Sequence, residues 1–191
     1  MTYNGKPLFY MDIDDETGLD LISLVEFPAV EMNFIAFNAE GENVRMAVNK
    51  EKKIVTGVAL IPEQKIYRYS QERGEYYVSF SKEAIERIAV RFFKDHNSTN
   101  ANLEHSEDVD GVVYFESYLV NNDRGIKPQE FDVPDGTWIV SAKIENEDLW
   151  KDIQEGKYKG FSIEGFLKMF DTKPVEIDTL EDLMEWINTQ N

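Results

Sequence analysis

The chain carries 37 acidic and 20 basic residues among 191, which gives a net charge of −17 and an isoelectric point near 4.5. Such a surface repels nucleic-acid phosphates and anionic lipid and suits basic peptides better, although excess acid also serves simply to keep a protein soluble. The absence of cysteine excludes disulfides, thiol catalysis and cysteine-ligated metal sites. No apolar run approaches the ~20 residues that span a bilayer, and the first residues lack the apolar core of a signal peptide, so we expect an intracellular protein that binds neither nucleic acid nor membrane.

The N-terminal part of the sequence divides into three stretches. Residues 1–20 are polar and acidic, and we expect them to form a segment apart from the main domain, which we place over 21–175. Residues 21–37 are rich in strand formers, with Pro28 marking a turn or a strand end. Residues 38–52 are polar and poor in strand formers, so they are predicted to form a loop or a mobile linker.

From residue 53 onward the pattern becomes regular. A strand is predicted over residues 53–61, and residues 65–69 and 76–80 are predicted to pair as a hairpin. Ser81 is a good N-cap for a helix over 82–95. Apolar side chains recur at helical spacing along this helix and predict its buried face: Ala84, Ile85, Ile88, Ala89, Phe92 and Phe93.

The second half of the sequence contains further strands and two more helices. The predicted elements are strands over residues 103–105, 111–120, 137–144 and 159–170, a short helix that opens at Asn146, and a C-terminal helix within 176–191. Strands dominate and their connections are mixed. This order indicates an α+β fold, in which a small, mostly antiparallel sheet closes or nearly closes into a β-barrel with helices packed outside it.

A serine lies inside the last predicted strand, in the run Gly160–Phe166. The spacing Gly-x-Ser-x-x-Gly does not fit the Gly-x-Ser-x-Gly elbow of α/β-hydrolases, and a serine in a strand is usually an ordinary residue of the pleat. Two features nevertheless mark Ser162 as a candidate nucleophile. The flanking glycines permit close backbone approach, and alternation along a strand places Ser162 and Glu164 on one face.

The chain has two histidines, and hence two candidate general bases for a serine nucleophile. His96 follows the predicted helix and is explained by the negative end of the helix dipole. His105 ends a short apolar stretch and is the better candidate base, although a lone histidine is more often structural. Neither histidine lies in a zinc-binding pattern, and the acidic run 12–18 does not complete a calcium loop, so we expect no metal and no cofactor.

Several short motifs occur in an order that is similar to one protein family. They are Ile22–Val30, Val55–Gly57 before Pro62, Leu103–His105, Gly111–Val113 with Glu116–Ser117, Gly136–Trp138 and Gly156–Gly165. Together they resemble the tailed-phage prohead (capsid maturation) serine proteases, specifically the XkdF-like branch, over roughly residues 20 to 170. The resemblance implies the fold of herpesvirus assemblins, a small β-barrel surrounded by helices. In related branches a segment like Ile22–Val30 follows the serine, so the order here allows a permuted barrel.

The resemblance also implies residue roles. The serine of the family's Gly-x-Ser motif corresponds to Ser162 as nucleophile, and the upstream histidine corresponds to His105 as general base. The third catalytic member varies among these proteases, and it stays open among four carboxylates: Glu164, Asp20, Glu104 and Glu116. A permuted barrel would bring Asp20 near the site.

The activity implied by the resemblance is a cofactor-independent serine endopeptidase. It would cleave the phage scaffold and major capsid protein inside the immature prohead, in the host cytoplasm, with a homo-oligomer left open. Two other classes of function are open as well: a non-catalytic virion or capsid-assembly protein that retains the protease fold, and an acidic module that binds basic peptides. An esterase or amidase of unrelated fold is the least favoured.

Overall fold

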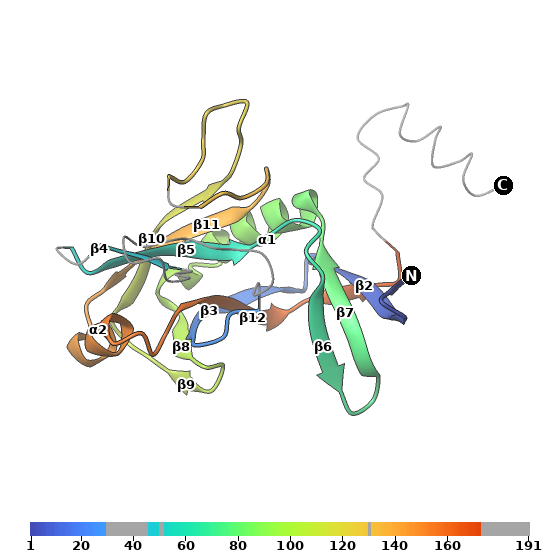
Figure 1. Cartoon of the computed structure of the whole chain (residues 1–191), viewed down its shortest axis with the longest axis horizontal. Helices are drawn as coiled ribbons and strands as arrows, with labels where there is room; N and C mark the ends of the chain where they lie inside the picture. Colours follow the sequence, from blue (N-terminus) through green and yellow to red (C-terminus); the bar gives the residue numbers. More distant parts are fainter. Residues whose placement is uncertain (30–45, 50–51, 130, 173–191) are drawn as a thin grey trace.

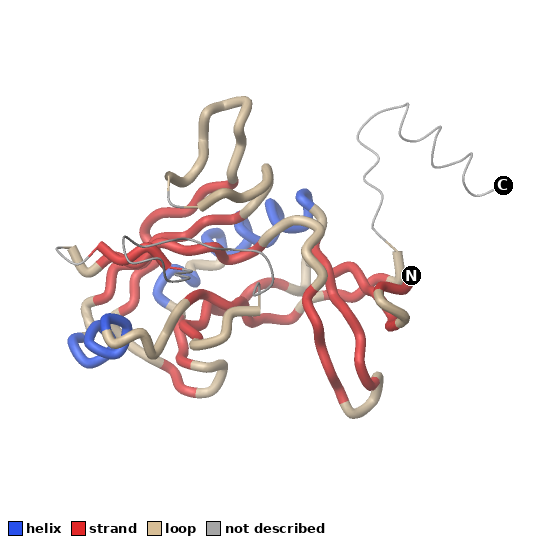
Figure 2. The backbone as a smooth tube through the Cα atoms, in the orientation of Figure 1, coloured by secondary structure: helices blue, strands red, loops and turns tan. Residues whose placement is uncertain are grey.

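The computed structural model describes residues 1–29, 46–49, 52–129 and 131–172, and within them strands prevail over helices (Figure 2). The strands are β1 (Thr2–Tyr3), β2 (Lys6–Asp12), β3 (Gly18–Val25), β4 (Met46–Asn49), β5 (Ile54–Leu60), β6 (Ile66–Ser70), β7 (Gly74–Phe80), β8 (Ala101–Leu103), β9 (Glu107–Asp108), β10 (Val112–Leu119), β11 (Trp138–Ile144), β12 (Gly160–Phe166) and β13 (Lys168–Phe170). The helices are α1 (Lys82–Lys94), the short 3-10 helix η1 (Asn97–Thr99) and α2 (Glu147–Gln154). Neither α-helix in the described ranges is long and apolar enough to cross a membrane.

The described strands form three sheets, of which two are mixed and the one containing β10, β11, β5 and β4 is antiparallel. One sheet has the order β1-β2-β7-β6, with β13 also paired to β2; the second has the order β10-β11-β5-β4, and the third β12-β3-β8-β9. Most pairs are antiparallel, but β2 pairs with β7 and β3 pairs with β8 in parallel. The β6–β7 hairpin projects near one end of the molecule, and α2 lies near the other (Figure 1).

The three sheets are open, so the prediction of a small closed β-barrel surrounded by helices is wrong. Within the described residues each sheet ends in strands that pair on one side only, such as β12 and β9 in the third sheet. A sequence pattern shows where strands form, but closure depends on which strands pair. Here the parallel pairs β2–β7 and β3–β8 join segments that are far apart in the chain. The α+β class agrees with the structure, whereas the barrel, and with it a permuted barrel, does not.

Most elements lie where the sequence predicts them, but several differ. The long strand predicted over 159–170 is divided into β12 and β13, and strand β4 lies inside the loop predicted over 38–52. Residues 38–45, 50 and 51 of that predicted loop lie outside the described residues, as does the C-terminal helix predicted within 176–191. The N-terminal segment 1–20 contains β1, β2 and the beginning of β3. The predicted domain boundaries stay a prediction.

Helix α1 joins the three sheets through its apolar face. Ser81 caps the helix, because its hydroxyl accepts a hydrogen bond from a first-turn N–H at 3.1 Å. The buried face is the predicted one, with Phe93 partly buried at its border. Phe92 packs edge-to-face against Tyr114 of β10 and Trp138 of β11, and the helix also contacts β2 and β3. Each large apolar side chain buried here contributes about 1.5–3 kcal/mol.

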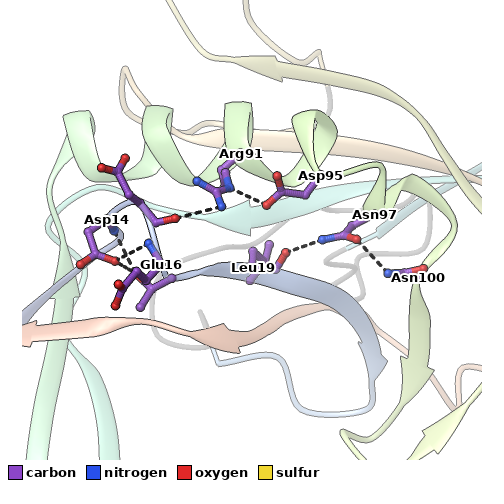
Figure 3. A network of polar contacts seen from close by, with 9 residues as sticks. Asp14, Glu16, Leu19, Arg91, Asp95, Asn97 and Asn100 are labelled. Carbon is purple, nitrogen blue, oxygen red and sulfur yellow. Dashed lines mark hydrogen bonds and ion pairs between the residues drawn. The ribbon is translucent and has the colours of Figure 1, made fainter.

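A network of polar contacts fixes the start of β3 against the C-terminal end of α1 (Figure 3). Asn97 donates a hydrogen bond to the Leu19 carbonyl at 2.9 Å. Arg91 is held by the Asp95 carboxylate and donates to the Asp15 carbonyl at 3.3 Å. Since β3 lies between β12 and β8, these contacts also set the position of the sheet that carries the candidate site.

The acidic run 12–18 is bound by cations of the chain itself. Arg87 on α1 makes two hydrogen bonds to the Asp12 carboxylate, at 3.1 and 2.6 Å. Lys168 of β13 pairs with Asp14. Hydrogen bonds from Lys168 and Thr17 lower the pKa of Asp14 to about 2. These carboxylates therefore tie the β2–β3 connection to α1 and β13.

Candidate active site

Three polar side chains lie next to one another across the third sheet. Ser162 of β12 pairs with Ser23 of β3, and Ser23 pairs with Asn102 of β8. All three are buried, with exposed fractions of 5%, 0% and 4% respectively. Residues that pair across a sheet point to the same face, so this polar row lies inside otherwise apolar strands. Buried polar groups require hydrogen-bond partners. Ser162 and Ser23 find theirs in His105, in the turn that follows β8, and the amide nitrogen of Asn102 finds one in Glu164 of β12.

Ser162 lies in the middle of β12, two residues before a β-bulge. The pairing with β3 shifts between Glu164 and Gly165, which is a common device for re-aiming side chains near sites. A Cβ atom at Gly165 would lie 2.3 Å from the Gly18 carbonyl oxygen and 2.7 Å from the Leu19 Cα. Glycine is therefore required here for close contact between β12 and β3. The close backbone approach expected at the flanking glycines is thus, at Gly165, an approach of β3.

His105 lies in the tight turn between β8 and β9, whereas the sequence predicted a strand over 103–105. Glu104 and His105 both have positive φ, 51° and 57°. Two-residue type I′ turns need this conformation at both positions, and asparagine or glycine usually supplies it. For other residues such a backbone costs on the order of 1–3 kcal/mol each. The turn is closed by the Ser106 N–H, which donates to the Leu103 carbonyl at 3.1 Å.

This turn brings the His105 ring between Ser162 and Glu164. His105 Nε2 lies 3.0 Å from Ser162 Oγ, and His105 Nδ1 lies 3.0 Å from Glu164 Oε2. Both distances are within hydrogen-bond range. The His105 and Glu164 side chains are 39% and 45% exposed, while Ser162 is almost fully buried. A hydroxyl, an imidazole and a carboxylate thus form one continuous hydrogen-bonded chain.

Two further residues contact this chain, and neither was a candidate from the sequence. Ser23 Oγ lies 2.9 Å from His105 Nδ1, so the imidazole has a second polar neighbour on the Glu164 side. Asn102 Nδ2 donates to Glu164 Oε2 at 3.1 Å. The available signal was weak: each is a polar residue at a buried position of a short apolar strand. Their relevance depends on the β12-β3-β8 strand order, which the sequence does not reveal.

Three other carboxylates were open as the third member, and none contacts His105 within the described residues. Glu104 accepts a hydrogen bond from a main-chain N–H just after β3, at 2.6 Å. Glu116 accepts one from a serine hydroxyl of β11, at 2.5 Å. The Asp20 side chain is exposed and forms no hydrogen bond or ion pair with a described residue. The second histidine, His96, lies just after α1 with a positive φ of 62°.

A pocket of about 220 Å³ lies beside Ser162. It is bounded by β12, by the end of β5 and by the sheet that contains β2, β7 and β6, and most of its lining is apolar. Its charged lining residues are Arg68 and Glu164. On this side β12 is an edge strand, since no described strand pairs with it there. The site therefore combines a hydroxyl next to an imidazole, an apolar pocket and an open strand edge.

A hydroxyl, an imidazole and a carboxylate in one hydrogen-bonded chain are the groups that serine hydrolases use, and comparison with known families gives the same class. Residues 43–171 match the family Peptidase_S78_2, described as "putative phage serine protease XkdF". The match spans more than half of the chain, and the chain belongs to this family of phage serine proteases. No curated protein and no solved structure gives a significant match. The small closed β-barrel that the resemblance to herpesvirus assemblins implied is not the arrangement that the described strands form.

Proposed function

We propose that this protein is a serine endopeptidase in which Ser162 is the nucleophile, His105 the general base and Glu164 the third member. The observation that carries the proposal is the pair of 3.0 Å contacts that joins the three side chains in the order hydroxyl, imidazole, carboxylate. Membership of a phage serine protease family supports the reaction class.

In the proposed reaction His105 Nε2 accepts the Ser162 hydroxyl proton while Oγ attacks the carbonyl carbon of the scissile peptide bond. The C–N bond then breaks, His105 gives the proton to the leaving amine, and an ester on Ser162 remains. A water molecule attacks this ester after losing a proton to the same imidazole. Cleavage of the ester bond releases the acid product and returns the proton to Ser162.

The proposed role of Glu164 is to select the productive state of the imidazole. His105 must carry its proton on Nδ1 so that Nε2 can accept the hydroxyl proton, and a carboxylate 3.0 Å from Nδ1 favours that tautomer. The same negative charge stabilises the imidazolium that forms during attack. Asn102 donates to the carboxylate oxygen and holds it toward the ring.

The open edge of β12 suggests how a polypeptide substrate binds. An extended segment can pair with an exposed strand edge through main-chain hydrogen bonds, while its alternate side chains enter pockets. Such a segment would pass Ser162, and the 220 Å³ pocket lies on the same side of the strand. This mode needs an extended or unfolded substrate segment, which suits cleavage in a flexible region.

The proposed substrates are the scaffold and the major capsid protein of a phage, cleaved during prohead maturation inside the immature particle in the host cytoplasm. The phage origin of the family supports a phage protein as substrate, and the order of the sequence motifs supports capsid maturation. The alternative is a non-catalytic virion or capsid-assembly protein that retains the protease fold. This alternative predicts that Ser162 and His105 lie too far apart to form a hydrogen bond, so the 3.0 Å contact between them favours the protease.

The proposal is tested by incubating the intact protein with its cognate capsid precursor and scaffold, with and without a fluorophosphonate that labels reactive serines. We expect discrete fragments from the wild type, no fragments after labelling, and none from Ser162→Ala or His105→Ala. His96→Asn is the matched control, because it removes the other histidine and retains a residue that tolerates positive φ. Unchanged processing by Ser162→Ala would contradict the assignment.

A further inference from the structure

The pocket beside Ser162 contains a cation in mostly apolar surroundings. Among the described residues of its lining, Arg68 is the one basic residue, and the others are largely apolar side chains such as Leu60, Val78 and Met169. Arg68 lies on β6 on the same face as Ile66, which is 4% exposed. Alternation along the strand therefore directs Arg68 toward the pocket rather than toward solvent.

Arg68 lacks a compensating negative charge within the part of the chain that the structure describes. Its side-chain hydrogen bond goes to a main-chain carbonyl, that of Tyr67, at 3.0 Å. No described carboxylate forms an ion pair with it. Burial lowers the pKa of Arg68 from its usual value, since desolvation disfavours the charged form.

The other charged lining residue does not neutralise this cation. Glu164 accepts hydrogen bonds from Asn102 and contacts His105 Nδ1, and no ion pair links it to Arg68. Arg68 therefore keeps hydrogen-bonding capacity at the pocket that it lines. A guanidinium has five N–H donors in a fork that matches a carboxylate, so it is the best group the pocket offers to an incoming ligand.

We propose that Arg68 makes this pocket a subsite for an acidic substrate side chain, Glu or Asp, at a position flanking the bond that Ser162 cleaves. The inference rests on the proposed function, because it assigns a specificity to the same site. A volume of about 220 Å³ is below the ~300–1,000 Å³ of clefts for drug-sized ligands. It suits one or two side chains of an extended chain. Such a side chain would place its methylenes on the apolar lining and its carboxylate on Arg68.

The negative net charge of the protein should restrict the binding of acidic polypeptides to those that reach Arg68. With a net charge of −17, the surface opposes the approach of acidic polypeptides in general. A substrate carboxylate forms a hydrogen bond with Arg68 only if it enters the pocket while the substrate backbone lies along β12. The amide oxygen of Gln can also accept a hydrogen bond from Arg68, but a charge-assisted hydrogen bond is roughly twice as strong as a neutral one, so we expect a preference for Glu over Gln of roughly fivefold to tenfold at that position.

The test uses a synthetic library of extended peptides, acetylated and amidated at their ends, with each position varied among all residues. Cleavage sites are read by mass spectrometry after incubation with the intact protein. A second copy of the library has free C-terminal carboxylates. In parallel, the rate of Ser162 labelling by a small fluorophosphonate without a peptide side chain reports the nucleophile alone.

We expect one position next to the cleaved bond to favour Glu or Asp over Gln or Asn by roughly fivefold to tenfold. Arg68→Gln removes this preference, Arg68→Lys keeps part of it, and Arg68→Glu shifts it toward Lys, while the labelling rate changes little. Arg73→Gln is the matched control. It removes one positive charge at the tip of the β6–β7 hairpin, to which Arg68 also belongs, and it leaves the pocket lining unchanged. Melting curves verify that each variant is folded.

Four outcomes would overturn the inference. The subsite is ruled out if the preference for acidic residues persists in Arg68→Gln. It is also ruled out if the wild type shows no such preference although its Ser162 is labelled. Both results leave the protease proposal intact. Cleavage confined to the free-acid library, near its C-termini, assigns Arg68 to a main-chain carboxylate instead. A wild type that neither cleaves nor reacts with the fluorophosphonate removes the proposed function and this inference with it.

Discussion

Replacing Glu164 by Gln tests the most specific part of the proposed site. The substitution keeps the size of the side chain but removes the negative charge 3.0 Å from His105 Nδ1. The amide can also turn its NH2 group toward the ring, which favours the wrong imidazole tautomer. Asn102 would still hold the amide oxygen, since its Nδ2 donates to this position at 3.1 Å in the wild type. We therefore expect the fold to be kept and the reactivity of Ser162 to fall.

The size of the effect follows from the distance and the exposure of the two groups. Two unit charges 3.0 Å apart interact by about 1.4 kcal/mol in water and about 5.5 kcal/mol at an effective permittivity of ~20. His105 and Glu164 are 39% and 45% exposed, so we take the lower part of this range, about 2–3 kcal/mol. That corresponds to a rate loss of roughly 30- to 200-fold. Serine proteases with a buried aspartate lose more, about 10⁴-fold, on the equivalent substitution.

The assay is the second-order rate constant for Ser162 labelling by a small fluorophosphonate, which needs no knowledge of the natural substrate. Asp20→Asn is the matched control, because it removes one negative charge from a neighbouring strand without a contact to His105. A Glu164→Gln variant that reacts within twofold of the wild type would refute the role of Glu164. A loss as complete as that of Ser162→Ala would instead indicate that the carboxylate holds the site together.

Three further substitutions test how the fold supports the site, each by chemical denaturation. Gly165→Ala is expected to lower the free energy of unfolding by about 1–3 kcal/mol and to slow Ser162 labelling, because the new methyl group meets main-chain atoms of β3. Tyr114→Phe is expected to cost about 1–3 kcal/mol, since the buried Tyr114 hydroxyl donates to the Ile22 carbonyl at 2.7 Å and that acceptor would lose its partner. Burial also raises the pKa of Tyr114 above the usual value of about 10 for tyrosine. The contribution of the neutral Tyr114 hydroxyl to the free energy of unfolding is therefore complete below about pH 10 and is lost as the pH rises further. This loss should be absent in Tyr114→Phe. Ser81→Ala removes the N-cap of α1 and should cost about 1 kcal/mol without changing Ser162 labelling.

Local sequence signals were sufficient for most elements of the fold. Ser81 with the apolar spacing behind it located α1 within a residue of its observed end, and the β-branched and aromatic runs located β5, β7 and β11. Sheet topology was not accessible in this way. The pairing of β2 with β7 and of β3 with β8 depends on contacts between distant segments, and a list of strands fits a closed barrel as well as three open sheets.

The candidate site shows the same division between local and distant information. The pairing of Ser162 with His105 was anticipated from the scarcity of histidine and from family resemblance, and alternation on β12 placed Glu164 on the face of Ser162. The proposed choice of Glu164 among four carboxylates rests on the position of the imidazole, which depends on a turn that propensities do not favour at Glu104 and His105. Ser23 and Asn102 were missed because their proximity exists only in the folded sheet.

In the proposed mechanism, the turn with two positive-φ residues fixes the imidazole before substrate arrives. Two residues with positive φ cost on the order of 1–3 kcal/mol each, and several contacts offset this cost. The Glu104 N–H donates to the Leu24 carbonyl at 3.2 Å, and its carboxylate accepts from the Glu26 N–H at 2.6 Å. Both contacts bind the turn to the end of β3, the strand next to β12. The His105 ring is thereby held at 3.0 Å from Ser162 by main-chain geometry as well as by its own hydrogen bonds, so that proton transfer requires little rearrangement.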